Sequence, residues 1–322
     1  MRPIQPLISF ITINYNQLDV SCEMLDSVRK LSYPNFEVIF IDNASKESPQ
    51  QYIETHYPEV HFIRSETNLG FSGGNNLGIK AAKGDFLFFI NNDTVLADGL
   101  VEQLVQLFEA IPNLGIVSPL IRYFPGKETE GKNIIQYAGT TEVNSYTARN
   151  STIGVGEEDL GQYKEAVPTP YVHGAAMMVP KEVIEKVGMM PESFFLYYEE
   201  LDWCEQIRRA GYQIYVEQRA NIYHKESVSV GKMSTLKTYY LTRNRIFFMR
   251  RNRSGFQVFL FAMFLLFFTI PKNVLLYLVK GEFDHLKAFL RGVWWNITKQ
   301  DQLLPANGKA INTFLVPSKS KN

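Results

Sequence analysis

The feature that most constrains the fold is an alternation of short apolar segments with longer amphipathic ones through the first 110 residues. The apolar segments are rich in β-branched and aromatic residues, which favour buried strands, whereas the segments between them repeat apolar residues at helical spacing. Strands that alternate with helices predict an α/β fold with a mainly parallel sheet, right-handed crossovers and flanking helices. The expected strands are residues 7–13, 36–42, 60–64 and 84–93, and the expected helices are residues 18–31, 48–56, 75–82 and 98–110.

Three of the expected strands end in polar residues. Asn14 and Asp42 each close an apolar strand, and Asp93 follows the strand that begins at residue 84. In open α/β sheets, ligands bind beyond the carboxyl ends of the strands. We therefore expect these three side chains to converge on one rim of the sheet and to mark a binding site there.

The chain beyond residue 122 is less regular. Residues 123–168 are rich in Gly, Thr, Asn and charged residues, which is typical of a hairpin or a loop insertion. The pattern then resumes, and one expected helix ends at Gly211, a favourable C-cap. The expected elements in this part are strands at 170–179, 212–217 and 220–224 and helices at 180–187 and 199–210.

Charge is balanced over the whole chain but not along it. The 33 basic residues equal the 33 acidic ones, and a neutral total argues against a dedicated nucleic-acid binder. Residues 1–224 carry 17 basic and 29 acidic side chains, whereas residues 225–322 carry 16 and 4. This asymmetry predicts an acidic body with a basic tail that faces a membrane or a polyanion.

The tail combines a basic segment with an apolar one. Residues 235–253 predict a basic helix, and residues 256–270 carry no charge before Pro271 and Lys272 interrupt them. A membrane span needs about 20 apolar residues. Three interpretations stay open: a helix in the cytoplasmic membrane interface, which the preceding arginines favour, a true span, and a helix buried in a core or a homodimer.

The cellular compartment is indicated by the cysteines and the N-terminus. Cys22 and Cys204 form neither a metal-type pair nor a disulfide framework. The apolar run near the N-terminus is too short for a signal peptide. These features predict a cytoplasmic protein, and the basic tail places it at the inner face of the cell membrane.

The polar strand ends each allow two interpretations. Asp93, in Asn91-Asn92-Asp93, is suited to bind a divalent cation that clamps a diphosphate, or it is a turn acid that caps the next helix. Asp42 is suited to accept a hydrogen bond from a nucleobase or a ribose, or it forms an Asx-turn with Asn43 or Ser45. Neither residue settles the choice by itself.

A glycine-rich segment precedes one expected helix. Residues 68–78 carry glycines at 70, 73, 74 and 78, a spacing that matches neither GxGxxG nor a Walker motif. Backbone N–H groups in such a segment could approach a phosphate. Taken alone, a tight loop with close helix packing is the favoured interpretation.

Three acids follow the aromatic run FFLYY. Glu199, Glu200 and Asp202 lie at the start of an expected helix, where the helix dipole favours negative charge. Aromatic walls and neighbouring acids would also raise a carboxyl pKa, as a general base requires. His224 ends a strand, and its functional interest depends on a nearby metal ion.

Together these segments resemble glycosyltransferase family 2, the inverting enzymes with a GT-A fold, and within it the rhamnosyltransferase-like branch of bacterial surface-polysaccharide enzymes. The matching segments keep the family's order over about 220 residues. They are ITINYNQ (11–17), VIFIDNAS (38–45), NLGFSGGNNLGI (68–79), GDFLFFINNDT (84–94), HGAAMMVPKEVIEKVG (173–188), FFLYYEELDWCEQIRRAGY (194–212) and IYHKESVS (222–229).

The resemblance implies roles for the matching residues. Glu200 would be the general base, with Glu199 and Asp202 beside it, although the family's usual "ED" pair ends in the shorter Asp. Asn91 replaces the first acid of the family's DXD motif, which leaves fewer charged metal ligands. The nucleotide sugar would be held by Asn14, Tyr15, Asp42, Asn68, Gly74, Asn75, Asn92 and Asp93, the acceptor or donor sugar by His173, Gly174 and Ala175, and Mg²⁺ or Mn²⁺ by Asp93 and His224.

The resemblance also implies the activity and the domain organisation. A GT-A catalytic domain would span residues 1–230, with nucleotide binding in 1–122 and the acceptor and base in 123–230, followed by a helical extension over 231–322. It would transfer one sugar, with rhamnose a candidate, from a UDP- or dTDP-sugar to a glycan or lipid-linked acceptor, next to a membrane surface. The alternatives are a non-catalytic nucleotide-sugar-binding relative and a processive polysaccharide synthase. The latter is disfavoured because Gln206-Ile-Arg-Arg-Ala210 lacks the Trp of the Gln-x-x-Arg-Trp motif.

Overall fold

A computed structural model describes residues 5–126, 129–225 and 234–299. The chain divides into two compact units. The first contains residues 1–141, 151–195 and 199–229, and the second contains residues 142–150, 196–198 and 230–322. The expected domain boundary at residue 230, and residues 226–229 of the last matching segment, lie outside the described residues.

The first unit is built on one ten-stranded sheet with the order β3-β2-β1-β4-β9-β6-β10-β5, and β7 and β8 pair with β6 and β10. Its strands are β1 (Ile8–Asn14), β2 (Phe36–Asp42), β3 (Val60–Arg64), β4 (Phe86–Ile90), β5 (Thr94–Leu96), β6 (Leu114–Tyr123), β7 (Ile135–Tyr137), β8 (Ala166–Pro168), β9 (Ala176–Pro180) and β10 (Gln213–His224). The four strands β3, β2, β1 and β4 are parallel, as expected. β9 is antiparallel to both β4 and β6, so the sheet is mixed.

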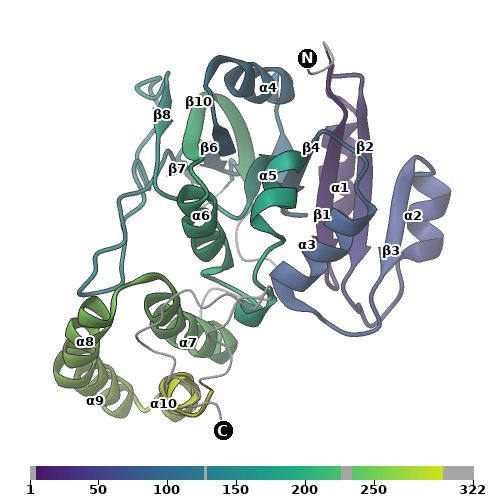
Figure 1. The fold of residues 1–322 in the computed structure, drawn as a ribbon. Coiled ribbons are helices and arrows are strands. Elements are labelled where there is room, and N and C mark those ends of the chain that lie inside the picture. The colour runs from purple at the N-terminus through teal and green to yellow at the C-terminus, as the bar shows by residue number, and fades with distance from the viewer. Residues whose placement is uncertain (1–4, 127–128, 226–233, 300–322) are drawn as a thin grey trace, which may run out of the picture. The chain divides into compact units, whose positions relative to one another are not determined.

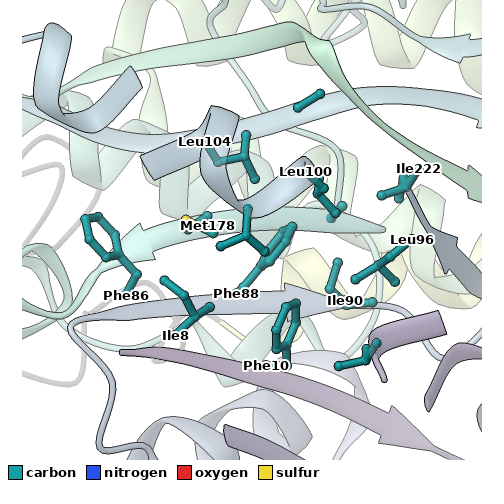
Figure 2. Close-up of a cluster of buried hydrophobic side chains, with 14 of the residues drawn as sticks. Ile8, Phe10, Phe86, Phe88, Ile90, Leu96, Leu100, Leu104, Met178 and Ile222 are labelled. Atoms are coloured by element: carbon teal, nitrogen blue, oxygen red, sulfur yellow. The ribbon is translucent and has the colours of Figure 1, made fainter. Parts of the chain in front are cut away.

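Helices cover both faces of this sheet (Figure 1). They are α1 (Leu18–Val28), α2 (Gln50–His56), α3 (Gly70–Ala81), α4 (Leu100–Ala110), α5 (Lys181–Val187), the short 3₁₀ helix η2 (Glu192–Phe194) and α6 (Glu199–Arg209). Alternate residues of each strand face opposite sides. Phe10 and Phe88 therefore pack in one core with side chains of α1 and α4, which Figure 2 shows for Leu100 and Leu104. On the other face, Phe89 contacts Trp203 of α6, with ring centroids 5.7 Å apart.

The glycine-rich segment is helical where a loop was expected. Helix α3 begins at Gly70 rather than near residue 75. A Cβ on Gly78 would collide with Ile11 of β1, and one on Gly74 would lie 2.7 Å from Ile13. The glycines therefore let α3 pack directly on β1, which is the close-packing interpretation of this segment.

Several strand boundaries differ from the expected ones. β6 was not expected, and the strand expected at 170–179 begins only at Ala176. The two strands expected at 212–217 and 220–224 form the single strand β10, whose register against β6 shifts between Glu217 and Asn221. The extra residues of this bulge explain why the sequence pattern appeared to break there.

The second unit is helical. It contains α7 (Thr235–Asn252), α8 (Gly255–Phe264), the π-helical turn η3 (Leu265–Thr269), α9 (Ile270–Lys280) and α10 (Phe283–Thr298). α10 packs closely on α7 at Gly292, where a Cβ would lie 2.9 Å from the carbonyl oxygen of Tyr239. The Asn296 amide donates to the carbonyl oxygen of Arg243 at 2.9 Å. α10 was not expected from the sequence.

Residues Gly255–Lys280 form one continuous helical segment of 26 residues, and its most apolar window of 18 residues has a mean hydropathy of 2.0. By length and composition it could cross a membrane, and only 11% of its most apolar window is buried in the structure. Pro271 does not end the helix, because it falls in the first turn of α9, directly after η3. Buried packing within the described part of the chain therefore does not explain this apolar composition.

Candidate active site

A hydrogen-bonded chain of polar side chains joins the strand ends. The Asn14 amide donates to Asp42 Oδ1 at 2.9 Å, across the register pair that ends β1 and β2. Ser21 Oγ of α1 donates to Asn14 Oδ1 at 3.1 Å and accepts from the Asn92 amide at 2.8 Å. Asn14, Asp42 and the 91–93 segment therefore do share one rim of the sheet.

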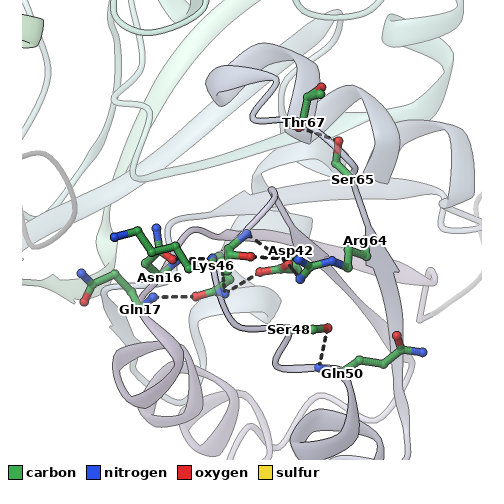
Figure 3. Close-up of polar contacts among 11 residues, drawn as sticks. Asn16, Gln17, Asp42, Lys46, Ser48, Gln50, Arg64, Ser65 and Thr67 are labelled. Carbon is green, nitrogen blue, oxygen red and sulfur yellow. Dashed lines mark hydrogen bonds and ion pairs between the residues drawn. The ribbon is translucent and has the colours of Figure 1, made fainter.

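Asp42 is fully buried, and both of its carboxylate oxygens are engaged. Figure 3 shows it facing Arg64, with which it forms an ion pair. Asp42 Oδ2 also accepts from the backbone N–H of Ser45 at 3.3 Å, which is the Asx-turn interpretation. Tyr15, the next residue after β1, is 40% exposed and offers a ring face to a ligand.

The segment before α3 is fixed by two asparagines. Asn68 Oδ1 accepts from the Gly70 N–H at 2.9 Å, and Asn43 Oδ1 accepts from the Leu69 N–H at 2.9 Å. Gly74 lies against Ile13, and Asn75 is buried with no hydrogen-bond partner for its Nδ2 in the described part of the chain. Asn75 Nδ2 is therefore a buried donor that a ligand would satisfy.

Residues 173–175 lie beside this segment and beside the 91–93 segment. A Cβ on Gly174 would be in ordinary contact with the ring of Phe71, at 3.7 Å. The Asn91 N–H donates to the carbonyl oxygen of Ala175 at 2.9 Å. His173, Gly174 and Ala175 thus border both candidate nucleotide-binding segments.

Asp93 and His224 form a buried pair. Asp93 Oδ1 lies 3.1 Å from His224 Nε2, and neither atom has a recorded hydrogen-bond partner among the described residues. His224 Nδ1 is 2.7 Å from Gln136 Oε1, which can only accept, so Nδ1 carries a hydrogen. Nε2 faces the carboxylate oxygen, and either a second ring proton or a bound metal ion would make this arrangement favourable. The pair fits a divalent metal ion whose remaining ligands come from a diphosphate and water.

His173 lies close to this pair but is held differently. Its ring centroid is 5.9 Å from that of His224. Its Nδ1 accepts from the Ala175 N–H at 3.1 Å. Burial, together with the nearby His224, lowers the pKa of His173 to about 3, so its ring is neutral.

Among the described residues, no group of three or more His, Cys, Asp or Glu side chains is arranged to hold a metal ion.

Burial separates the three acids at the start of α6. Glu199 and Asp202 are 3% and 0% exposed, and Asp202 accepts from the Gln206 amide at 2.8 Å. Glu200 is only partly buried. Of the three carboxylates, Glu200 is therefore the one that a bound hydroxyl group could best reach.

The surroundings of Glu200 favour its neutral form. Burial in a low-dielectric environment raises the pKa of Glu200 to about 7. Cys204, one turn further along α6, lies against the backbone of Val172, and its thiol stays neutral because burial raises its pKa to about 12. A carboxyl with a pKa near 7 is well matched to general-base chemistry at neutral pH.

The backbone before α6 is strained. Phe195 has a φ of 66°, a conformation that non-glycine residues rarely adopt. Its carbonyl oxygen accepts from the Phe71 N–H at 2.6 Å, and a Cβ on Gly70 would collide with it. Such strain persists only where the surroundings enforce it, and here it joins the start of α3 to the segment that leads to Glu200.

The sequence did not reveal two residues that position the site. Gln136 orients His224, and Arg64 pairs with Asp42. Gln136 lies in β7, inside the segment expected to be an irregular insertion. The only signal was the apolar pair Ile134-Ile135 before it, which is too short to predict a strand.

Comparisons with known proteins place the chain in a family. A family model described as glycosyl transferase family 2 matches residues 9–188, more than half of the chain. The low-salt glycan biosynthesis hexosyltransferase Agl10 of Haloferax volcanii is 26% identical over 243 residues, which are 74% of each chain. The N-acetylglucosaminyl-diphospho-decaprenol L-rhamnosyltransferase of Mycobacterium tuberculosis is 22% identical over 61% of this chain and 68% of its own.

Solved structures share the fold. The mannosyltransferase PcManGT from Pyrobaculum calidifontis, in complex with GDP-Man and Mn²⁺, has a TM-score of 0.53 at 14% identity and covers 91% of this chain and 87% of its own. GalNAc-T7 with UDP, GalNAc and Mn²⁺ has a TM-score of 0.57 at 17% identity, and this chain spans only 48% of it. These matches confirm the expected GT-A-like α/β architecture.

Proposed function

The chain belongs to glycosyltransferase family 2 and is a glycosyltransferase, and from this premise we propose that it moves one sugar from a nucleoside-diphosphate sugar to an acceptor hydroxyl with inversion. The observation that carries the proposal is Glu200, the one partly accessible acid of α6, whose pKa is raised to about 7. Its carboxylate removes the proton of the acceptor hydroxyl as that oxygen attacks the anomeric carbon from the face opposite the diphosphate. A single displacement of this kind inverts the configuration and needs no covalent sugar–enzyme intermediate.

The nucleoside diphosphate would occupy the rim where β1, β2 and β4 end. The exposed ring of Tyr15 would stack on the base, and Asn14, Asp42 and Asn92 would line the ribose side of the site. Asn68, Gly74 and Asn75 lie at the start of α3, where backbone N–H groups favour a phosphate. The base is proposed to be uracil or thymine.

Asp93 and His224 would hold Mg²⁺ or Mn²⁺ in the place where their two acceptor atoms face each other. The ion would neutralise charge on the departing diphosphate. Gln136 keeps His224 in the tautomer that presents Nε2 as a ligand. His173, Gly174 and Ala175 would line the sugar between this pair and Glu200.

The acceptor is proposed to be a glycan or a lipid-linked glycan. The Mycobacterium relative is named for an acceptor in which a sugar is joined through a diphosphate to decaprenol, and for rhamnose as the sugar transferred. The exposed apolar helix from Gly255 to Lys280 suits a protein that works at the cytoplasmic face of a membrane. A second copy of the chain is the other partner that could cover this helix.

The base assignment is tested with Glu200→Gln. We expect transfer to fall by about 10²- to 10⁴-fold, because the amide cannot accept the proton, while the affinity for the nucleotide stays within about twofold. The measurement pairs a transfer assay on a panel of UDP- and dTDP-sugars with calorimetric binding of the nucleotide. Glu185→Gln, on the exposed side of α5, is the matched control.

Near-normal transfer by Glu200→Gln would contradict the assignment. If the wild-type protein binds a nucleotide sugar but neither transfers nor hydrolyses it, the chain is the non-catalytic relative instead. Products longer than one added sugar would favour the processive alternative.

A further inference from the structure

The helical second unit contains a cavity of about 380 Å³. All of its described lining residues belong to this unit. The helix α7 forms one wall, the segment from η3 to α9 forms a second, and the start of α10 forms a third. The donor site proposed above uses none of these residues.

The lining of the cavity is cationic. Arg149, Lys237 and Arg245 border it, and none of its described lining residues is acidic. No ion pair joins any of the three cations to a described carboxylate. Clustered like charges without counter-charges destabilise the unit, so an anion bound among them would be strongly favoured.

Arg245 shows the effect of these uncompensated charges most clearly. Its guanidinium donates to the carbonyl oxygen of Thr147, with Nε at 2.9 Å, and no acid balances its charge among the described residues. Burial and the like charge of Arg149 lower the pKa of Arg245 to about 10. The group is still cationic at neutral pH, and its remaining N–H groups suit the oxygens of a phosphate.

Neutral polar groups complete the lining. Ser234 caps the N-terminus of α7, an 18-residue helix, and the positive end of the helix dipole lies there. Thr238 Oγ1 is 2.8 Å from His285 Nδ1, and Asn273 and Tyr277 contribute further polar atoms. Arginine, lysine and hydroxyl groups around a cavity of this size are the chemistry that recognises a phosphate or a diphosphate.

The same helical segment presents an apolar surface on its other side. Leu265 and Thr269 line the cavity, whereas Leu266, Phe267 and Phe268 are 55–65% exposed. A ligand with a phosphate head and a long apolar chain matches both sides at once. Tyr198, which also lines the cavity, comes two residues before Glu200 in the chain.

We propose that this cavity binds the phosphate or diphosphate group of a phosphate ester, and that the ester is the lipid-linked acceptor. The inference rests on the proposed function and adds to it the part of the chain that recognises the acceptor's phosphate. Arg149, Lys237 and Arg245 neutralise the phosphate oxygens, and the exposed apolar residues of η3 contact the lipid chain.

The test uses the full chain with a chelator present, so that metal-dependent binding at the nucleotide site does not contribute. Inorganic pyrophosphate is titrated by calorimetry into the wild-type protein and into the double variant Arg149→Gln, Lys237→Gln. We expect the double variant to lose at least tenfold in affinity, with a melting temperature no lower than that of the wild type, because the two changes remove like-charge repulsion. Arg291→Gln, an exposed cation of α10 outside the cavity, is the matched control and should bind as the wild type does.

A second arm identifies the source of the phosphate. Phosphatidylcholine vesicles with and without phosphatidic acid are sedimented with each protein. Loss of the phosphatidic-acid-dependent binding in the double variant supports a lipid-borne phosphate, whereas loss of pyrophosphate binding alone supports a phosphate site for a soluble ester.

Equal pyrophosphate affinity in the wild type and the double variant, or no binding by the wild type, would overturn the inference. Nucleotide-sugar binding is measured on the same samples with metal added. If it is normal in every variant, the proposed function stands even when the cavity fails, and if it is absent in the wild type, the proposed function itself fails.

Discussion

The two ring nitrogens of His224 have different partners, and this difference decides what the residue can bind. Nδ1 contacts an amide oxygen, so a hydrogen is held there, and Nε2 faces the carboxylate of Asp93. Asp93 Oδ1 lies 3.1 Å from Nε2, so a neutral His224 ring would leave two acceptor atoms facing the place proposed for the metal ion. Gln136 is therefore a positioning residue for the proposed metal ion.

A first prediction follows for Gln136→Ala. Loss of the amide frees the His224 ring to rotate and to change tautomer, so we expect the affinity of the nucleotide-bound protein for Mn²⁺ to fall by roughly 10- to 100-fold. Calorimetry with Mn²⁺ in the presence of UDP measures this change. Gln51→Ala, on the exposed surface of α2, is the control. Unchanged Mn²⁺ affinity would mean that a proton, and not a metal ion, lies between Asp93 and His224.

A second prediction concerns pH. Burial raises the pKa of Glu200 to about 7, and only the ionised carboxylate accepts a proton. The transfer rate at saturating metal and donor should therefore rise through pH 7 and fall about tenfold for each pH unit below 6. A pH–rate profile of kcat from pH 5.5 to 8.5 measures this dependence, and a flat profile would contradict the role of Glu200.

The local residue pattern could propose the three acids of α6 but could not rank them, and the choice of Glu200 rested on the family resemblance. All three lie in one helical turn, where the dipole accounts for acidic residues equally well. Only the tertiary packing that buries Glu199 and Asp202 and leaves Glu200 partly accessible distinguishes them. The same limit applies to Asp42, whose buried ion pair with Arg64 depends on the pairing of β2 with β3.

At the scale of elements, the packing of α3 on β1 sets the site geometry. Asn75 lies on α3, Asn14 ends β1, and the glycines between them remove the side chains that would separate helix and strand. The sequence offered close packing as one interpretation of these glycines. It could not place the start of the helix, because glycine is a poor helix former and only tertiary contact stabilises such a turn.

The third prediction tests this contact with Gly78→Ala. The added Cβ would collide with Ile11, so we expect the free energy of unfolding to fall by about 1–3 kcal/mol, although alanine is the better helix former. Urea unfolding followed by circular dichroism measures the loss. Gly126→Ala is the control, since its nearest neighbour would be 4.0 Å away. A more stable Gly78→Ala protein would show that α3 does not pack against β1 in this way.

At the scale of the whole molecule, the acidic and the basic parts of the sequence correspond to different kinds of surface. The proposed catalytic acids belong to the first unit, whereas the second unit carries the cationic cavity and the exposed apolar helix. The neutral total is therefore a cancellation between an acidic first part and a basic second part of the sequence.

The fourth prediction concerns this surface. We expect the full chain to sediment with anionic vesicles, and the triple variant Leu266→Glu, Phe267→Glu, Phe268→Glu to stay in the supernatant, because each change replaces an exposed apolar side chain by a charge. Leu160→Glu, 81% exposed in the first unit, is the control. If the triple variant instead changes only the oligomeric state, the apolar helix is an interface between copies of the chain.

The sequence predicted the first 110 residues well and the sheet beyond them poorly. Strands β1 to β4 alternate with helices, so each signal is local and each crossover is short. β6, β9 and β10 pair with strands distant in the chain, and β9 runs against its neighbours. A local sequence pattern does not indicate the direction of a strand. Because a long insertion follows β6, the sequence also does not indicate which later strands pair with β6.

The long stretch of chain between β6 and β10 also has a consequence for folding during synthesis. β6 and β10 pair along most of their length, yet roughly 90 residues separate them, which corresponds to roughly 5–20 s of translation. During that interval the nascent chain holds a four-stranded parallel sheet and an apolar β6 without its main neighbour. The stretch that matches the family model ends at residue 188, before β10 begins, so this match does not include the strand that pairs along most of β6. The last strand of the sheet, β10, precedes α7 and the apolar segment Gly255–Lys280 in the chain, so the sheet can be completed only shortly before that segment is synthesised.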